Sequence, residues 1–165
     1  SRYDGVKYGF SDHNVDSMWD RIESSRSSGF GLEVKRRIML GTYSLSSGYY
    51  DEYYGKAEMT RQLIKKELNS VFDKVDILVT PTSPTTAFKI GEKISDPMAM
   101  YSSDIMTIPA NIAGIPGISI PVKNSNGLPV GAQLVGPYLK DNNLLNITNE
   151  IQKLTDWHLN AVEFD

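Results

Sequence analysis

Residues 117–135, GISIPVKNSNGLPVGAQLV, contain the pattern that decides the fold class. Two short apolar runs, 117–122 and 130–135, have the length and the β-branched residues typical of strands. Between them, Asn126 and Gly127 form a pair that readily adopts the positive φ angles of a tight turn. We therefore expect two consecutive strands joined by a turn in this part of the chain.

The segments on either side complete an α/β pattern. Residues 75–80, VDILVT, predict a buried strand that Pro81 ends. Apolar residues at helical spacing predict helices over residues 15–27, 32–46, 49–73 and 98–113, and a last helix that includes Leu144 and Trp157. We expect Asn14 or Asp12 to cap the first of these helices. Pro109 is expected to interrupt the helix over residues 98–113. A short alternating stretch from Val6 to Phe10 predicts an edge strand. Since no long linker divides the chain, we expect one three-layer α/β body.

Composition places the chain among ordinary globular proteins. It has 165 residues, a net charge of −3 and no cysteine, which excludes disulfides and thiolate chemistry. The charge is too small to predict binding to a nucleic acid or a membrane. No apolar run approaches the roughly 20 residues of a membrane helix. The chain begins Ser-Arg-Tyr-Asp rather than with Met, so we expect further residues to precede it.

Residues 29–54, GFGLEVKRRIMLGTYSLSSGYYDEYY, place a basic triple inside a helical pattern. An apolar stripe from Val34 through Ile38 and Gly41 to Leu45 predicts one buried helix face. Glycine costs a helix about 1 kcal/mol relative to alanine. Gly41 on this stripe therefore predicts the close approach of another backbone.

The triple Lys35-Arg36-Arg37 contains a charge at the edge of that stripe. On a helical wheel Arg36 falls opposite the stripe, whereas Arg37 lies only about 60° from Val34. A charge beside a buried surface needs a partner, because desolvating it alone is costly. Arg37 could bind a substrate carboxylate with its bidentate fork. Alternatively, Arg37 forms a structural salt bridge, or its side chain snorkels along the apolar surface to bring the charge to water.

Asp104, within the segment MYSSDIMTI, is the second candidate. Helix capping is the simpler interpretation, and pairing with a substrate ammonium group is the functional one. An arginine for the α-carboxylate and an aspartate for the α-amino group would form an amino-acid clamp, although sequence pattern alone does not bring them together. His13 and His158 lie in no metal-ligand spacing and are interpreted as surface residues. The tyrosines of residues 49–54 are interpreted as packing.

Five stretches of the chain, residues 1–9, 29–54, 75–84, 96–117 and 127–136, resemble the amidase signature family in the expected order. The resemblance covers essentially residues 1–140. Its most specific block, residues 33–50, is characteristic of the glutaminase subunits of tRNA-dependent amidotransferases. The pattern of residues 109–121 is instead shared across the family.

The resemblance implies an α/β amidase fold with a mixed, mostly parallel sheet enclosed by helices, of which residues 1–165 are the C-terminal portion of one domain. The family uses a Ser–Ser–Lys triad and an oxyanion hole of backbone amides. The triad and an assisting tyrosine align upstream of Ser1, so no catalytic residue is assigned and the fragment alone is expected to be inactive. Glutamine would be held by residues that align with Arg37 and Asp104.

The resemblance also implies a function and partners. A subunit of this kind releases ammonia for the conversion of glutamyl-tRNA(Gln) to glutaminyl-tRNA(Gln), together with two other subunits. It needs no cofactor or metal itself, because ATP and Mg belong to a partner subunit, which also carries most tRNA contacts. The implied location is the cytoplasm, or an organelle for an organellar enzyme. A stand-alone amidase and a non-catalytic assembly or binding module are the alternatives.

Overall fold

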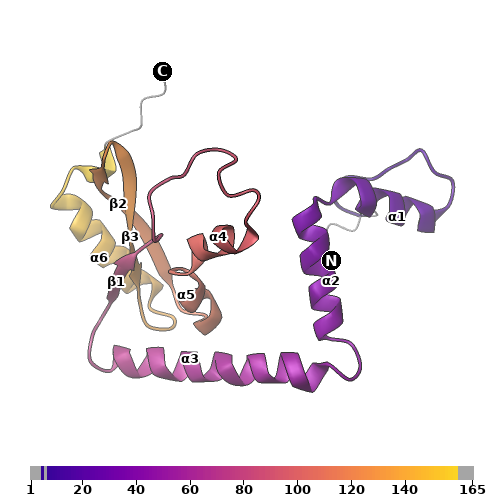
Figure 1. Ribbon diagram of the computed structural model, residues 1–165. Helices are drawn as coiled ribbons and strands as arrows, with labels where there is room; N and C mark the ends of the chain where they lie inside the picture. Colours follow the sequence, from indigo (N-terminus) through magenta and orange to yellow (C-terminus); the bar gives the residue numbers. More distant parts are fainter. Residues whose placement is uncertain (1–4, 6, 160–165) are drawn as a thin grey trace. The chain divides into compact units, whose positions relative to one another are not determined.

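The computed structural model describes residue 5 and residues 7–159. The chain divides into two compact units, Ser1–Ala57 and Glu58–Asp165 (Figure 1). The first unit is helical where it is described, and the second combines helices with a three-stranded sheet. The α/β class is thereby confirmed, whereas one body over residues 1–165 stays a prediction.

Helix α1, Met18–Gly29, begins later than its apolar pattern predicted. Ser17 caps it, because the Ser17 Oγ accepts a hydrogen bond from the Trp19 amide at 3.2 Å. The prediction of Asn14 or Asp12 as the cap is wrong. Asp12 Oδ1 instead accepts from the Asn14 amide at 3.0 Å, which closes a local turn ahead of the helix.

The interior of the first unit is built around a small polar residue. Ser25 on α1 is only 4% exposed, and its Oγ accepts from the Asp12 amide at 2.8 Å. A Cβ added at Gly5 would lie 2.7 Å from the Ser25 Cβ, so the chain before α1 passes close to the helix there. The expected edge strand is not observed over residues 7–10, and Val6 lies outside the described residues.

Helix α2, Leu32–Ser44, confirms the helix predicted from the central block but not its burial. Val34 and Ile38 are 45% and 50% exposed, so the described residues of the first unit, Ser1–Ala57, do not bury the stripe. Apart from its own helix, no described atom of the first unit lies within 4 Å of a Cβ built on Gly41, so the expected close approach is not observed within that unit. The apolar pattern predicted a face that needs cover, and no described element of the first unit supplies that cover.

The tyrosines that follow α2 pack against one another, as the sequence predicted. A turn at Gly48, where φ is +89°, leads into the π-helix η1, Tyr50–Gly55, which precedes α3, Lys56–Phe72. The ring centroids of Tyr43 and Tyr49 are 4.5 Å apart, and those of Tyr50 and Tyr54 are 4.9 Å apart. Aromatic stacking of this kind fixes the connection between α2 and η1.

The sheet of the second unit has the strand order β1-β3-β2. Its strands are β1, Leu78–Pro81, β2, Gly117–Ser125, and β3, Leu128–Val135. Asn126 and Gly127 have φ angles of 51° and 80°, so the predicted turn is confirmed. Both neighbouring pairs run antiparallel, so these three strands form an antiparallel part of the mixed sheet expected for the family. A two-residue turn reverses the chain, whereas parallel neighbours need a long crossover.

Helices pack against both faces of this sheet. Successive residues of β3 point to opposite faces, so neighbouring residues of this strand contact different helices. Leu134 is 1% exposed and packs with Ile120 and with Leu144 of α6, Asp141–Lys153. Val135 instead contacts α5, Ile108–Ala113, and the end of α3. The two helices α5 and α6 therefore lie on opposite faces (Figure 1).

Two predicted helices are shorter than their patterns suggested. The segment 98–113 divides into α4, Pro97–Tyr101, the 3₁₀ turn η2, Ser102–Asp104, and α5. Pro109 lies in the first turn of α5, the position in which its missing N–H costs no hydrogen bond. The last helix ends at Lys153, and Trp157 belongs to a separate 3₁₀ turn, η3, Trp157–Leu159.

Candidate functional site

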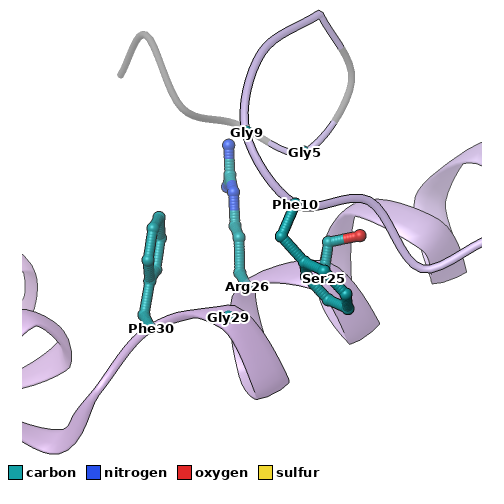
Figure 2. A pocket seen from close by; sticks show the side chains of 7 residues that line it. All are labelled: Gly5, Gly9, Phe10, Ser25, Arg26, Gly29 and Phe30. Atoms are coloured by element: carbon teal, nitrogen blue, oxygen red, sulfur yellow. The ribbon is translucent and has the colours of Figure 1, made fainter.

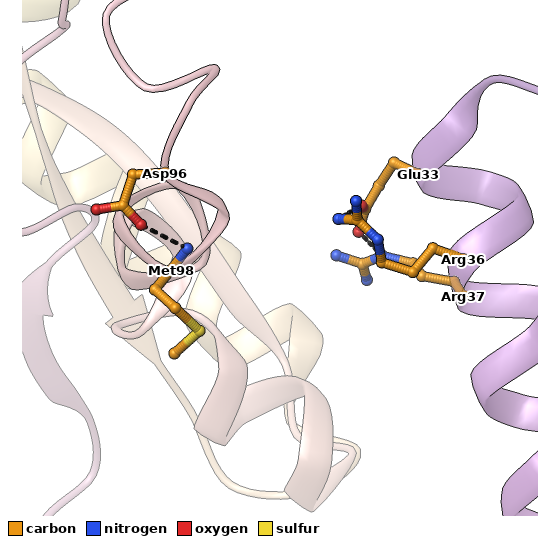
Figure 3. A network of polar contacts seen from close by, with 5 residues as sticks. All are labelled: Glu33, Arg36, Arg37, Asp96 and Met98. Atoms are coloured by element: carbon orange, nitrogen blue, oxygen red, sulfur yellow. Dashed lines mark hydrogen bonds and ion pairs between the residues drawn. The ribbon is translucent and has the colours of Figure 1, made fainter.

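Arg37 lies on the surface of α2, paired with an acidic residue of the same helix. Its Nε donates to Glu33 Oε1 at 3.0 Å, and Arg36 Nη1 donates to Glu33 Oε2 at 2.8 Å (Figure 3). The Arg37 side chain is 66% exposed. The salt-bridge interpretation of Arg37 is thus confirmed as a contact, but an exposed pair of this kind contributes only about 0–1 kcal/mol. The helical wheel placed Arg36 opposite the apolar stripe and Arg37 at its edge. In the structure both arginines pair with Glu33.

Asp104 ends the turn η2, between α4 and α5, and its side chain is exposed. The capping interpretation of this residue is wrong. Asp96 caps α4, accepting from the amides of Met98 and Ala99 at 3.0 and 3.1 Å, as Figure 3 shows for Met98. Helix α5 has no side-chain cap, and Asp104 meets Thr107 only through its backbone oxygen. Its carboxylate is therefore not committed to a helix end.

Arg37 and Asp104 belong to different units of the chain, Ser1–Ala57 and Glu58–Asp165. Each presents an exposed charged group on a helical turn. Their assignment as the two halves of an amino-acid clamp stays a prediction.

The histidines and serines, to which no catalytic or metal-binding role was assigned, have structural surroundings of their own. His13 and His158 are both exposed, as expected. Among residues 5 and 7–159, no group of three His, Cys, Asp or Glu side chains could hold a metal ion. Ser24 donates to Asp12 Oδ2, and Ser46 Oγ donates to the Tyr43 carbonyl at 2.7 Å. Both serine hydroxyls form local hydrogen bonds that support the surrounding backbone.

Two groups of the first unit have shifted pKa values with local causes. The hydrogen bond from Ser24, together with the Asn14 amide, holds the pKa of Asp12 below its usual range. A hydrogen bond with Tyr49, followed by burial, raises the pKa of Tyr43. The tyrosine therefore stays protonated around neutral pH and serves in packing. Neither shift creates a general base near pH 7.

The first unit also contains a cavity of about 230 Å³, lined by Gly5, Gly9, Phe10, Ser25, Arg26, Gly29 and Phe30. Figure 2 shows the Arg26 side chain extended toward Gly9. Neither Arg37 nor Asp104 lines this cavity. It is separate from the predicted clamp residues.

A second hollow, of about 330 Å³, lies in the sheet-bearing unit. Its lining is rich in hydroxyl groups, and it includes Thr82, Ser83, Thr85, Thr86 and Ser119. Thr82 Oγ1 lies 2.7 Å from Ser119 Oγ. The sequence predicted only a turn-rich connection after Pro81, and its run of hydroxyl residues was the signal for this polar lining.

Gln133 is a buried polar residue that the sequence pattern did not single out. It lies in the middle of β3 and is 6% exposed. A glutamine inside an otherwise apolar strand was the available signal, since a buried amide must find hydrogen-bond partners.

Comparison with known proteins relates nearly the whole chain to one family. The family model described as Amidase matches residues 1–145. The chain is 54% identical over 158 residues to the glutamyl-tRNA(Gln) amidotransferase A subunit of Chloroflexus aggregans, covering 96% of this chain and 32% of that protein. It is also 54% identical to the protein of that name from Microcystis aeruginosa, covering 99% and 34%. The chain thus spans about a third of the length of these relatives.

Solved structures agree with this relation. The glutamyl-tRNA(Gln) amidotransferase A subunit from Thermotoga maritima is 49% identical, with a TM-score of 0.61 over 80% of this chain and 29% of that one. A bacterial aryl acylamidase is 19% identical with a TM-score of 0.61, which shows a likeness of fold alone. Within the described residues no helix is both long and apolar enough to cross a membrane.

Proposed function

Because the chain belongs to the Amidase family, we propose that it is the C-terminal third of a glutaminase subunit of a tRNA-dependent amidotransferase. The observation that carries the proposal is 54% identity over nearly the whole chain to proteins named as the A subunit of glutamyl-tRNA(Gln) amidotransferase. Identity at that level supports a shared function more strongly than a likeness of fold does. The aryl acylamidase, at 19%, supports the fold without supporting a substrate.

In this proposal the nucleophile lies outside the present chain. A serine attacks the carboxamide carbon of glutamine, and backbone amides stabilise the tetrahedral oxyanion. Ammonia leaves, and water hydrolyses the acyl-enzyme to glutamate. The present chain contributes recognition of the amino-acid end of the substrate.

Arg37 and Asp104 are the residues proposed for that recognition. A guanidinium fork binds a carboxylate through two parallel hydrogen bonds, which suits Arg37 to the α-carboxylate of glutamine. The exposed carboxylate of Asp104, which caps neither neighbouring helix, suits the α-ammonium group. Together they would distinguish glutamine from amides that lack the amino-acid end.

The wider assignments belong to the same proposal and go beyond what the names of the relatives state. The ammonia would pass to a partner subunit that uses ATP and Mg to amidate glutamyl-tRNA(Gln) in a three-subunit, cytoplasmic ligase. This chain itself would bind no cofactor and little of the tRNA. Its net charge of −3 supports that division, because phosphate contacts need basic surfaces.

The test is a glutaminase assay of the full-length protein in its complex. Arg37→Ala and Asp104→Asn should each raise KM for glutamine while hydrolysis of a simple apolar amide stays unchanged. Unchanged glutamine kinetics in both variants, with efficient hydrolysis of the apolar amide, would instead indicate a stand-alone amidase. Residues 1–165 expressed alone should show no glutaminase activity, and a cooperative melt of that piece would favour an independent assembly or binding module.

A further inference from the structure

Gln133 connects the sheet to the segment that carries Asp104. The Gln133 Nε2 donates to the Met106 carbonyl oxygen at 2.9 Å and to Thr80 Oγ1 at 3.0 Å. Thr80 is its direct neighbour on β1, and Ser119 is its direct neighbour on β2. Gln133 therefore lies in the centre of a polar row that crosses the sheet, and both of its amide hydrogens have acceptors.

Met106 lies two residues after Asp104, in the connection between η2 and α5. The same connection is held on its other side at Ser103. Lys93 Nζ donates to Ser103 Oγ at 2.7 Å, and Ser83 Oγ donates to the Ser103 carbonyl at 3.5 Å. Asp104 is thus placed between two tethered residues, while its own carboxylate is left for another use.

The two tethers differ in strength for a physical reason. Gln133 is almost fully buried in the central strand, so its bond to Met106 is shielded from water and its side chain is held by packing. Removing the amide would leave the Met106 carbonyl without this donor, and the turn would move to find another. Lys93 is a flexible side chain outside the sheet and fixes Ser103 less rigidly.

We propose that Gln133 is a positioning residue that sets the place of Asp104 for the substrate ammonium group. The proposal rests on the role proposed for Asp104 and adds the element that orients it. Gln133 does not touch substrate in this scheme. It acts through the Met106 carbonyl, and its effect is confined to substrates that carry the group bound by Asp104.

The test compares two substrates in the full-length protein within its complex. Gln133→Met keeps the side-chain length and removes both donors. It should raise KM for glutamine about three- to tenfold, the range of one hydrogen bond. Hydrolysis of glutaramate, which keeps the carboxamide and the carboxylate of glutamine but lacks its amino group, should change by less than about twofold. Gln133→Leu, which also removes both donors with an uncharged side chain, is the second variant should the first not fold.

Two further variants give the test its controls. In an Asp104→Asn background, Gln133→Met should add no further rise in KM, because the group it positions is already lost. Thr148→Val is the matched control, since Thr148 is also buried and its Oγ1 has no hydrogen-bond partner among the described residues. Its kinetics should equal those of the unmodified protein.

The outcomes separate this proposal from the one it rests on. An equal loss with glutamine and glutaramate would show a merely structural role for Gln133 and overturn the inference. A rise in KM with Asp104→Asn but none with Gln133→Met would also overturn it, while leaving the role of Asp104 intact. No effect from Asp104→Asn itself would reject the proposed clamp together with the inference.

Discussion

Arg37 Nε lies 3.0 Å from Glu33 Oε1, one helical turn earlier on α2. The same carboxylate binds Arg36 at 2.8 Å, so one acidic residue orients two neighbouring guanidinium groups. Because all three side chains are substantially exposed, the pairs contribute at most about 1 kcal/mol each. Glu33 can therefore orient Arg37 without preventing it from binding the carboxylate of a substrate.

Arg37→Ala should lower kcat/KM for glutamine about tenfold or more, because a charge-assisted hydrogen bond contributes about 1.5–3 kcal/mol. Arg36→Ala is the matched control, since it removes the other arginine bound to Glu33 on the same helix. We expect that control to change kcat/KM less than about twofold. Steady-state glutaminase kinetics of the full-length variants give the answer. Equal losses in both variants would reject a specific role for Arg37.

Variants of Asp96 and Asp104 should have different effects, one on the free energy of unfolding and the other on substrate binding. Asp96→Ala removes the cap of α4 and should lower the free energy of unfolding by about 1 kcal/mol. Asp104→Ala should leave that free energy nearly unchanged and raise KM for glutamine. Urea unfolding and glutamine kinetics on both variants test the contrast. A loss of stability with Asp104→Ala that matched the Asp96 variant would restore the capping interpretation.

Gly131→Ala should destabilise the sheet-bearing unit. A Cβ at Gly131 would lie 2.8 Å from both Ser119 Oγ and Thr82 Oγ1, and 3.2 Å from the Thr82 Cβ. Overpacking of this kind costs about 1–3 kcal/mol. Adding Ser119→Ala removes one of the close contacts, so the double variant should be more stable than the sum of the single effects. Strict additivity in thermal unfolding would show that the site relaxes elsewhere.

Asp12 should titrate below an ordinary aspartate, because Ser24 and the Asn14 amide stabilise its ionised form. The folded-state pKa is lower than the unfolded one. Its contribution to stability is therefore complete above the usual aspartate range and is lost as the pH falls through the lowered pKa. Ser24→Ala should move the pKa of Asp12 back toward its ordinary value. NMR titration of the Asp12 carboxyl group measures its pKa in the unmodified protein and in the variant. An identical pKa in the two proteins would contradict the role of the Ser24 hydrogen bond.

Local sequence patterns predicted the positions of helices and turns better than they predicted which helix faces are buried. The Asn126-Gly127 turn, the helix over Leu32–Ser44 and the interruption at Pro109 all appear where residue chemistry required them. The cap of α1 was assigned too early, because several short polar residues precede that helix and sequence does not show which one adopts cap geometry. Burial was the weakest prediction. An apolar stripe indicates that α2 needs cover, but not that the cover lies within the same chain segment.

The sequence by itself determined the α/β class, because strands and helices depend on local periodicity and residue type. Its resemblance to the amidase family, and not periodicity, made Arg37 and Asp104 the candidate residues. Only the tertiary structure decided that the three strands pair antiparallel and that Asp96, rather than Asp104, caps a helix. It also decided that Gln133 holds the Met106 carbonyl, which is 27 positions away along the chain. Hydrogen bonds over such separations form only when folding places donor and acceptor within about 3 Å, and no spacing rule along the chain contains that information.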